Sequence, residues 1–183
     1  HIGVCVMKMA EGLDTGAYCV NRSMETTDHL NAAELRAELA DLGAQALLTA
    51  LHHIEDGQIR WTVQDEDRVT VAEKIGQHEL DIVLDDSAAT AHRKVRASDN
   101  SHTCRLIIGG RETALLKVAE VQPDDPLFEQ IADMELGQVR FACKRLILKM
   151  DDGYLEVLSC RPASKKAMDA KAFAAGVQNI KSG

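Results

Sequence analysis

The sequence of 183 residues has no long hydrophobic run and few aromatic residues, which make up 3% of the chain. No apolar stretch approaches the roughly 20 residues that a membrane-spanning helix needs, and the chain opens in a strand-like segment instead of a signal peptide. We therefore expect no membrane partner and a cytoplasmic location. With 45% hydrophobic residues, the chain can still bury a core as one large or two small domains.

Cysteine is also scarce, and its five copies lie far apart, mostly inside apolar runs. An odd number of widely spaced cysteines does not fit a disulfide framework, so we expect buried, free thiols. His52, His53 and His92 have no carboxylate or cysteine at metal-ligand spacing, and we predict no metal site.

The formal net charge of −8 is unevenly distributed. Residues 138–183 contain nine Lys and Arg and four Asp and Glu, so this segment carries +5 and residues 1–137 carry −13. Such asymmetry suggests a basic module attached to an acidic one. A solvated charged face is the alternative explanation.

The stretch 4–20 places one carboxylate between glycines after an apolar run. Residues 4–9 indicate a mostly buried strand, and residues 18–20 indicate a returning strand. Gly12 and Gly16 permit the sharp backbone path that would present Asp14 at the end of the first strand. Asp14 is therefore the best candidate for chemistry.

Within this stretch, the segment Leu13-Asp14-Thr15-Gly16-Ala17 matches the active-site loop of aspartic proteases. Those enzymes bring two copies of the loop together so that two carboxylates share a proton. A single copy would have to dimerise, and Glu11 and Gly12 stand where that fold needs apolar residues. A dimeric protease is thus the less favoured interpretation.

Asn31 and Glu34 form a plausible capping box, which predicts a helix that ends at Asp56-Gly57. Apolar residues then recur at three- and four-residue steps, as expected for one buried stripe: Leu35, Leu39, Leu42, Ala46, Ala50 and Ile54. Strand and helix together indicate the closing part of an α/β domain over residues 1–63. Residues 64–84 indicate a linker, with Val69, Val71 and Ile75 as anchors onto a neighbouring surface.

Residues 85–183 indicate a second domain. Ser87 is expected to cap a helix through Ala97, and residues 99–101 a turn. The apolar period then changes to two, which predicts five strands, at 103–108, 111–121, 138–143, 145–150 and 154–160. Five short strands favour a small barrel or a sandwich. Asp169 is expected to cap a final helix that carries Met168 and Phe173 and ends at Gly176.

Several of these segments, in this order, resemble the formyltransferase family that uses 10-formyltetrahydrofolate, and within it the methionyl-tRNA formyltransferases. Residues 3–16 are similar to the family's strand and folate loop, and residues 31–51 to the helix that follows. Residues 72–75 resemble its linker motif, residues 87–97 the helix that opens its C-terminal domain, and residues 155–176 the close of that domain.

The resemblance implies a fragment of a Rossmann-like α/β catalytic domain followed by a small β-barrel of oligonucleotide-binding type. It makes Asp14 the catalytic aspartate of an enzyme that transfers a formyl group from 10-formyltetrahydrofolate to methionyl initiator tRNA, as a monomer. The folate-binding loop would consist of Ala10, Glu11, Gly12, Leu13 and Asp14. The family's catalytic His and Asn lie in a segment upstream of this stretch, so we expect the chain alone to be inactive.

A barrel of this kind would follow the tRNA backbone with Lys and Arg, and the scarcity of aromatics favours phosphate contacts over base stacking. The predicted contacts are Lys74, Arg93, Lys94, Arg96, Lys144, Arg145, Lys165 and Lys166. Residues 98–103 depart from the aromatic, proline-rich stretch that is common in the family. A binding or interaction module without catalysis and a sugar formyltransferase remain alternatives.

Overall fold

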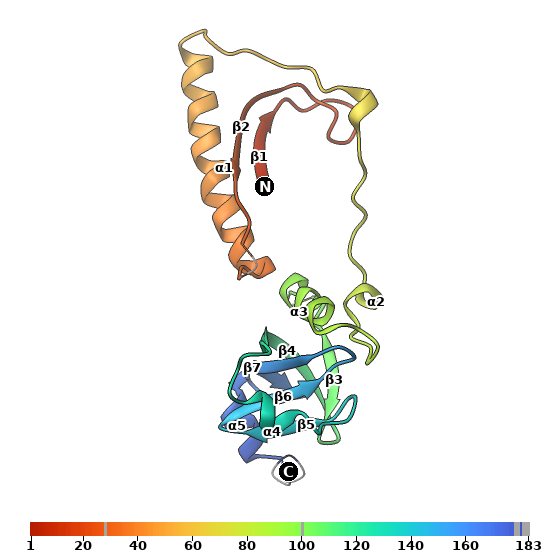
Figure 1. The fold of residues 1–183 in the computed structure, drawn as a ribbon. Helices are drawn as coiled ribbons and strands as arrows, with labels where there is room; N and C mark the ends of the chain where they lie inside the picture. The colour runs from red at the N-terminus through yellow and green to blue at the C-terminus, as the bar shows by residue number, and fades with distance from the viewer. Residues whose placement is uncertain (28, 100, 178–179, 181–183) are drawn as a thin grey trace. The chain divides into compact units, whose positions relative to one another are not determined.

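The computed structural model describes residues 1–27, 29–99, 101–177 and 180 (Figure 1). The chain divides into two compact units, His1–Lys74 and Ile75–Gly183. Within the residues that the structure describes, no helix combines the length and apolar character needed to cross a membrane.

The first unit contains an antiparallel hairpin of β1 (Ile2–Met7) and β2 (Tyr18–Met24). The expected strand pair is therefore confirmed, but the expectation that residues 4–9 are mostly buried is wrong. Side chains of β1 alternate, Cys5 is exposed, and Met9 lies beyond the strand with 93% of its surface exposed. Successive side chains of a strand point to opposite faces, so a helix on one face leaves the other face open.

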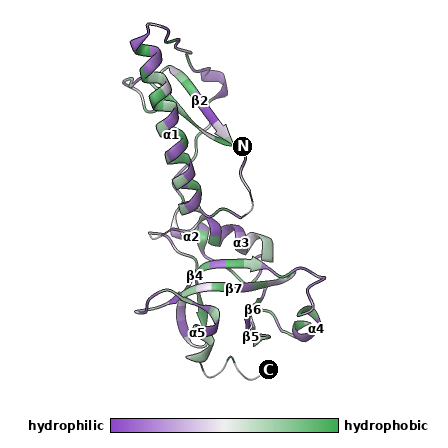
Figure 2. Cartoon of the chain, turned by 90° about the vertical axis from the view of Figure 1, so that its left-hand side faces the viewer, coloured by the Kyte–Doolittle hydropathy of each residue, from purple (hydrophilic) through white to green (hydrophobic). Residues whose placement is uncertain are grey.

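That helix is α1 (Ala32–Glu55), which packs against both strands of the hairpin. The capping box is confirmed, because Asn31 Oδ1 accepts from the amides of Ala33 and Glu34 at 3.0 and 2.9 Å, and Glu34 Oε2 accepts from the Asn31 amide at 2.9 Å. Hydrophobic and hydrophilic residues both occur along the whole length of this helix (Figure 2). Of the predicted apolar stripe, Ala46 and Ala50 are buried, but Ile54 at its end is 51% exposed.

After α1, the chain passes through a turn at Gly57, whose φ is +66°, and returns along the hairpin. A single 3₁₀ turn, η1 (Glu66–Arg68), interrupts an otherwise irregular segment. The expected anchoring of this segment by three apolar side chains is wrong, because Val69, Val71 and Ile75 are 66%, 85% and 50% exposed. An extended segment without a sheet partner leaves such side chains in water.

The second unit is built on a curled antiparallel sheet in the order β3-β4-β7-β6-β5, with β8 paired to β7 (Figure 1). The five predicted strands are confirmed: four are shorter than predicted, and β7 extends two residues further, to Pro162. β8, which is only two residues long, was not predicted. The strands are β3 (Arg105–Ile108), β4 (Arg111–Glu120), β5 (Val139–Ala142), β6 (Arg145–Lys149), β7 (Tyr154–Pro162) and β8 (Met168–Asp169).

Among the described residues of this unit, four α-helices accompany the sheet: α2 (Gln77–Leu80), α3 (Ala88–Ala97), α4 (Phe128–Ile131) and α5 (Ala170–Ala175). The predicted caps of α3 and α5 are confirmed, since Ser87 Oγ accepts from the Thr90 amide and Asp169 Oδ1 from the Ala172 amide. Met168 belongs to β8 and not to the final helix. The turn predicted at 99–101 includes residue 100, which lies outside the described residues.

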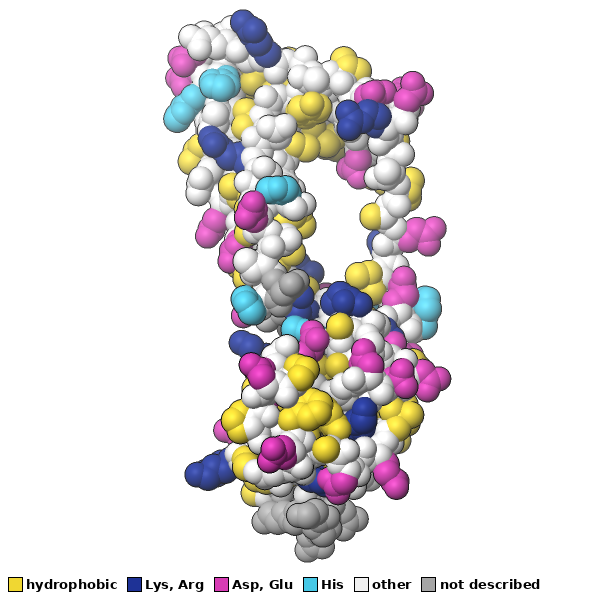
Figure 3. All heavy atoms as spheres, in the orientation of Figure 1, with side chains coloured by type: hydrophobic (Ala, Val, Ile, Leu, Met, Phe, Trp, Pro, Cys, Tyr) yellow, Lys and Arg dark blue, Asp and Glu magenta, His cyan; other side chains and the backbone are white. Residues whose placement is uncertain are grey.

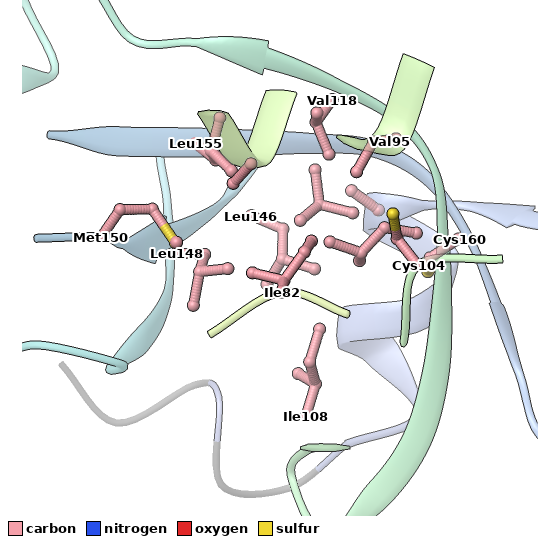
Figure 4. Packing of buried hydrophobic residues seen from close by; sticks show 14 of the residues in the cluster. Ile82, Val95, Cys104, Ile108, Val118, Leu146, Leu148, Met150, Leu155 and Cys160 are labelled. Carbon is pink, nitrogen blue, oxygen red and sulfur yellow. The ribbon is translucent and has the colours of Figure 1, made fainter. Parts of the chain in front are cut away.

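The core of this unit forms on both faces of the sheet. Leu146 and Leu148 of β6 point into the larger cluster (Figure 4), and Ile147 between them belongs to a second cluster beside α4. Leu80 and Ile82, which lie in the predicted linker, are buried in the larger cluster. Strand alternation thus supplies apolar side chains to two layers at once.

All five cysteines fall within the described residues, and all are free thiols. The expectation of buried thiols holds for Cys104 and Cys160, where burial raises the pKa of each thiol to about 11. It is wrong for Cys5 and Cys143, which are exposed because one lies on the open face of the hairpin and the other in a turn.

Candidate functional site

The loop of residues 8–17 connects β1 to β2 and carries Asp14. Its two ends are joined where the Lys8 amide donates to the Ala17 carbonyl at 2.9 Å. Inside the loop, Thr15 Oγ1 donates to the Gly12 carbonyl at 3.1 Å. The Asp14 carboxylate thus lies on a short loop whose two ends are fixed by the hairpin.

Asp14 is exposed and adopts a left-handed backbone conformation with φ of 55°. Among residues with a side chain, Asp and Asn tolerate this region best. The expected role of Gly16 in the path is visible in the packing, because a Cβ at this position would lie 1.7 Å from the Lys8 carbonyl oxygen. The glycine lets the returning chain pass close against the outgoing one.

The segment after α1 braces this loop. Gln64 Nε2 donates to the carbonyls of Asp14 and Gly16, at 2.7 and 2.8 Å. Thr62 pairs with Tyr18 through two backbone hydrogen bonds of 2.7 and 2.9 Å, and Lys8 Nζ lies 4.4 Å from the centre of the Trp61 ring. No sequence pattern indicates the role of Gln64, because its partners lie in a loop about fifty residues away.

The predicted folate-binding residues all lie in this loop. Ala10, Glu11, Gly12, Leu13 and Asp14 are consecutive and exposed, and Leu13 is 91% exposed. Their backbone amides and carbonyls are hydrogen-bonding groups that a flat, polar heterocycle could use.

The basic residues of α3 differ in their surroundings. Arg93 is exposed and donates to Thr90 Oγ1 at 3.0 Å. Lys94 Nζ instead contacts an Asp86 carboxylate oxygen at 2.7 Å and the Asp81 carbonyl at 2.8 Å. Its side chain is only 20% exposed, so it is tied into the fold. Arg96 is half-buried.

Arg145 and Lys144 also differ, although they are neighbours. The Arg145 guanidinium bridges Asp125 and Glu156, each at 2.6 Å. These carboxylates raise the pKa of Arg145, and the Leu127 amide together with Arg145 lowers the pKa of Asp125. Lys144 is exposed in the β5–β6 turn, with φ of 66°.

A basic pocket of about 250 Å³ lies in the second unit where β3, β4 and the end of β7 meet. Arg105, Arg161 and Lys165 line it, and Arg105 is paired with Glu112 at 3.1 Å. Sequence reasoning selected Lys165 but missed the two arginines, because β3 and β7 come together only through β4. Lys166 and Lys74 are exposed outside this pocket.

Lys and Arg side chains are interspersed with Asp and Glu on the face shown in Figure 3. Across residues 1–27, 29–99, 101–177 and 180, no three His, Cys, Asp or Glu side chains gather as a metal site would require. The chemical features of the described residues are therefore the loop that carries Asp14 and several separate basic side chains.

Solved structures share this fold. HypX from Aquifex aeolicus in complex with tetrahydrofolic acid matches 98% of this chain and 31% of its own, with a TM-score of 0.74 at 19% identity. WlaRD, a sugar 3N-formyl transferase, matches 90% of this chain and 56% of its own, with a TM-score of 0.54 at 13% identity. The fold is thus shared with HypX and with a sugar 3N-formyl transferase.

The sequence comparisons identify the family. The profile described as "Formyl transferase, C-terminal domain" matches residues 74–178, and the chain belongs to this family. Methionyl-tRNA formyltransferases of Bartonella quintana (strain Toulouse) and Bartonella tribocorum (strain CIP 105476 / IBS 506) are each 31% identical to it, over 96% and 95% of the chain. The chain spans 55% and 54% of the length of these two relatives.

Proposed function

We propose that this chain takes part in the transfer of a formyl group from 10-formyltetrahydrofolate to the amino group of methionyl initiator tRNA, as part of a monomeric enzyme. In this proposal, the first unit is the end of a Rossmann-like catalytic domain and the second is a barrel of oligonucleotide-binding type. The observation that carries it is the exposed Asp14 carboxylate in a braced loop, within a chain of the formyltransferase family.

The reaction explains why a carboxylate is needed. The amine attacks the formyl carbon, an oxyanion develops on the formyl oxygen, and the amine must lose a proton before the folate nitrogen leaves. An ionised carboxylate can accept that proton directly or through a water molecule. Asp14 would hold this role, and the backbone of residues 10–14 would bind the folate.

The second unit would hold the tRNA through its phosphates. Lys74, Arg93, Lys144, Lys165 and Lys166 are exposed and are the proposed direct contacts. The pocket beside Lys165 adds Arg105 and Arg161, whose guanidinium groups match the geometry of phosphate oxygens. Lys94, Arg96 and Arg145 are half-buried and would support this surface without being its direct phosphate contacts.

Two titrations of this chain test the proposal, one with 5-formyltetrahydrofolate and one with initiator tRNA. We expect both to bind, and tRNA binding to weaken with salt. Binding of tRNA without folate would favour an interaction module without catalysis. Binding of folate together with a nucleotide-linked sugar, but not tRNA, would favour a sugar formyltransferase, and acid-dependent peptide cleavage by a dimer would favour a protease.

The role of Asp14 is tested by the substitution Asp14→Asn in the full-length gene product. Asn keeps the size of the side chain and tolerates the left-handed backbone, so the change removes the charge alone. We expect formyl transfer to methionyl initiator tRNA to fall by at least about 100-fold, the lower range for loss of a general base. Full activity of this variant would reject the assignment.

A further inference from the structure

We propose that Gln64 is a positioning residue that sets the orientation of Asp14 by holding two carbonyls of its loop. This inference rests on the proposed function of the loop. Gln64 comes from the segment after α1, and no chemical role was expected at this position. Its side chain is the link between that segment and the backbone of Asp14 itself.

The geometry of the contact is specific. Both hydrogen bonds come from the same atom, Nε2, and end on the carbonyl oxygens of Asp14 and Gly16, at 2.7 and 2.8 Å. Because both partners are acceptors, only the amide nitrogen can face them, which fixes the orientation of the amide group. Residues 14 and 16 are thereby held with their carbonyls converging on one point.

This convergence explains how the backbone of Asp14 is kept in a sparsely populated conformation. A left-handed φ in a residue with a side chain costs free energy and persists only where neighbouring contacts enforce it. Gln64 holds the Asp14 carbonyl directly, and the tight passage of Gly16 beside the Lys8 carbonyl holds the next point of the path. The Asp14 side chain branches from this same backbone, so the same contacts set the position from which the carboxylate projects.

The chemistry requires an uncharged donor at this position. A glutamate of the same size would present two more acceptors to two carbonyl oxygens, and a methionine would present no donor. Either change would release both carbonyls while preserving the volume of the half-buried side chain. A structural role based on packing alone would tolerate both substitutions.

The test uses the full chain with Gln64→Met and Gln64→Glu. Gln58→Glu is the control, because it makes the same change at an exposed glutamine of the same returning segment. The carbonyl ¹³C resonances of Asp14 and Gly16 are recorded by NMR, and affinity for 5-formyltetrahydrofolate is measured by calorimetry. These signals report on the loop in the folded protein, whereas a stabilising role alone would change only the denaturation midpoint.

We expect both Gln64 variants to shift the two carbonyl resonances upfield and to bind the folate about tenfold more weakly, as the loss of two neutral hydrogen bonds implies. Gln58→Glu should match the wild type. Unchanged carbonyl resonances and unchanged affinity in folded Gln64→Met would overturn the inference. If the wild-type chain binds no folate, the proposed function fails, and the carbonyl resonances still decide the role of Gln64.

Discussion

At the scale of single residues, the space available for a Cβ differs between the two glycines of the Asp14 loop, and this difference predicts the effect of substituting each of them. Gly16→Ala should open the loop, because the new Cβ would meet the Lys8 carbonyl oxygen at 1.7 Å and backbone cannot move aside cheaply. We expect a cost of about 1–3 kcal/mol. The measurement is hydrogen exchange of the Lys8 amide, which donates to Ala17 across the base of the loop.

Gly12→Ala is the matched control for this change. Its Cβ would meet the Thr15 side chain at 2.8 Å, and a side chain can rotate away. We expect its exchange rate at Lys8 to stay near that of the wild type. Equal rates in both alanine variants would contradict the steric account of the loop.

Residues whose environment is set locally were predictable from the sequence. Asn31, Ser87 and Asp169 cap their helices as expected, since a cap depends on amides two or three residues away. Gln64 was missed because its partners lie about fifty residues earlier in the chain. Lys94 and Arg145 were selected for their charge, but their carboxylate partners follow only from the tertiary structure.

At the scale of elements, substitutions of two adjacent basic residues of α3 should have different effects, one on the stability of the fold and the other on tRNA binding. Lys94→Met should destabilise the second unit by about 2 kcal/mol, because it leaves the Asp86 carboxylate, 11% exposed, without its cation. Arg93→Met should leave the stability unchanged and weaken tRNA binding, since Arg93 is exposed. Urea denaturation and a tRNA titration of both variants measure the two effects.

The reverse pattern would show that these side chains have been assigned to the wrong roles. A stable Lys94→Met variant with weak tRNA binding would place Lys94 at the interface. An unstable Arg93→Met variant would place Arg93 in the fold.

Arg145 of β6 connects β7 with the loop before α4, and its ion pairs predict a pH dependence of stability. It pairs with Asp125 before α4 and with Glu156 of β7, and the pKa of Asp125 lies below its usual value because of the Leu127 amide and Arg145. A carboxyl with a lowered pKa in the fold contributes its full stability above the unfolded value of about 3.9. That stability is lost as the pH falls from there through the lower folded value.

Asp125→Asn should therefore lower the denaturation midpoint at pH 7 and flatten its decline below about pH 4. The control is Asp124→Asn, which changes an exposed neighbour for which we expect no such effect. Urea midpoints between pH 2.5 and 7, values chosen to bracket the roughly 3.9 carboxyl reference, measure the difference. The same acid decline in both variants would exclude Asp125 as its source.

The elements that the sequence predicted are those with a sustained period or a cap, such as α1 and the five strands of the second unit. The short elements α2, α4 and β8 span four, four and two residues, which is too little for a period to appear. The burial of β1 was overestimated because its apolar side chains alternate across a two-stranded hairpin with one helix. An apolar run in the sequence shows that a strand is hydrophobic, but it does not show how many faces of that strand other elements cover.

At the scale of the whole molecule, the sequence predicted a change of character along the chain, and the structure shows two compact units. The uneven charge was visible in composition, but composition does not separate cations within ion pairs from those facing water. Arg140 illustrates this, because it counts toward the basic segment and lies 2.6 Å from Asp133. Cations that are held by carboxylates contribute less to the binding of a polyanion than cations that face water.

The exposed cations predict how tRNA affinity depends on salt. If about four phosphates are neutralised, affinity should fall by about 100-fold between 50 and 200 mM salt, because each contact releases condensed counterions. Lys165→Glu with Lys166→Glu should reduce the slope of log affinity against log salt by about two, whereas Lys171→Glu, at an exposed lysine of α5, should leave it unchanged. A slope that both sets of changes reduce equally would indicate a diffuse field and not a defined contact at residues 165 and 166.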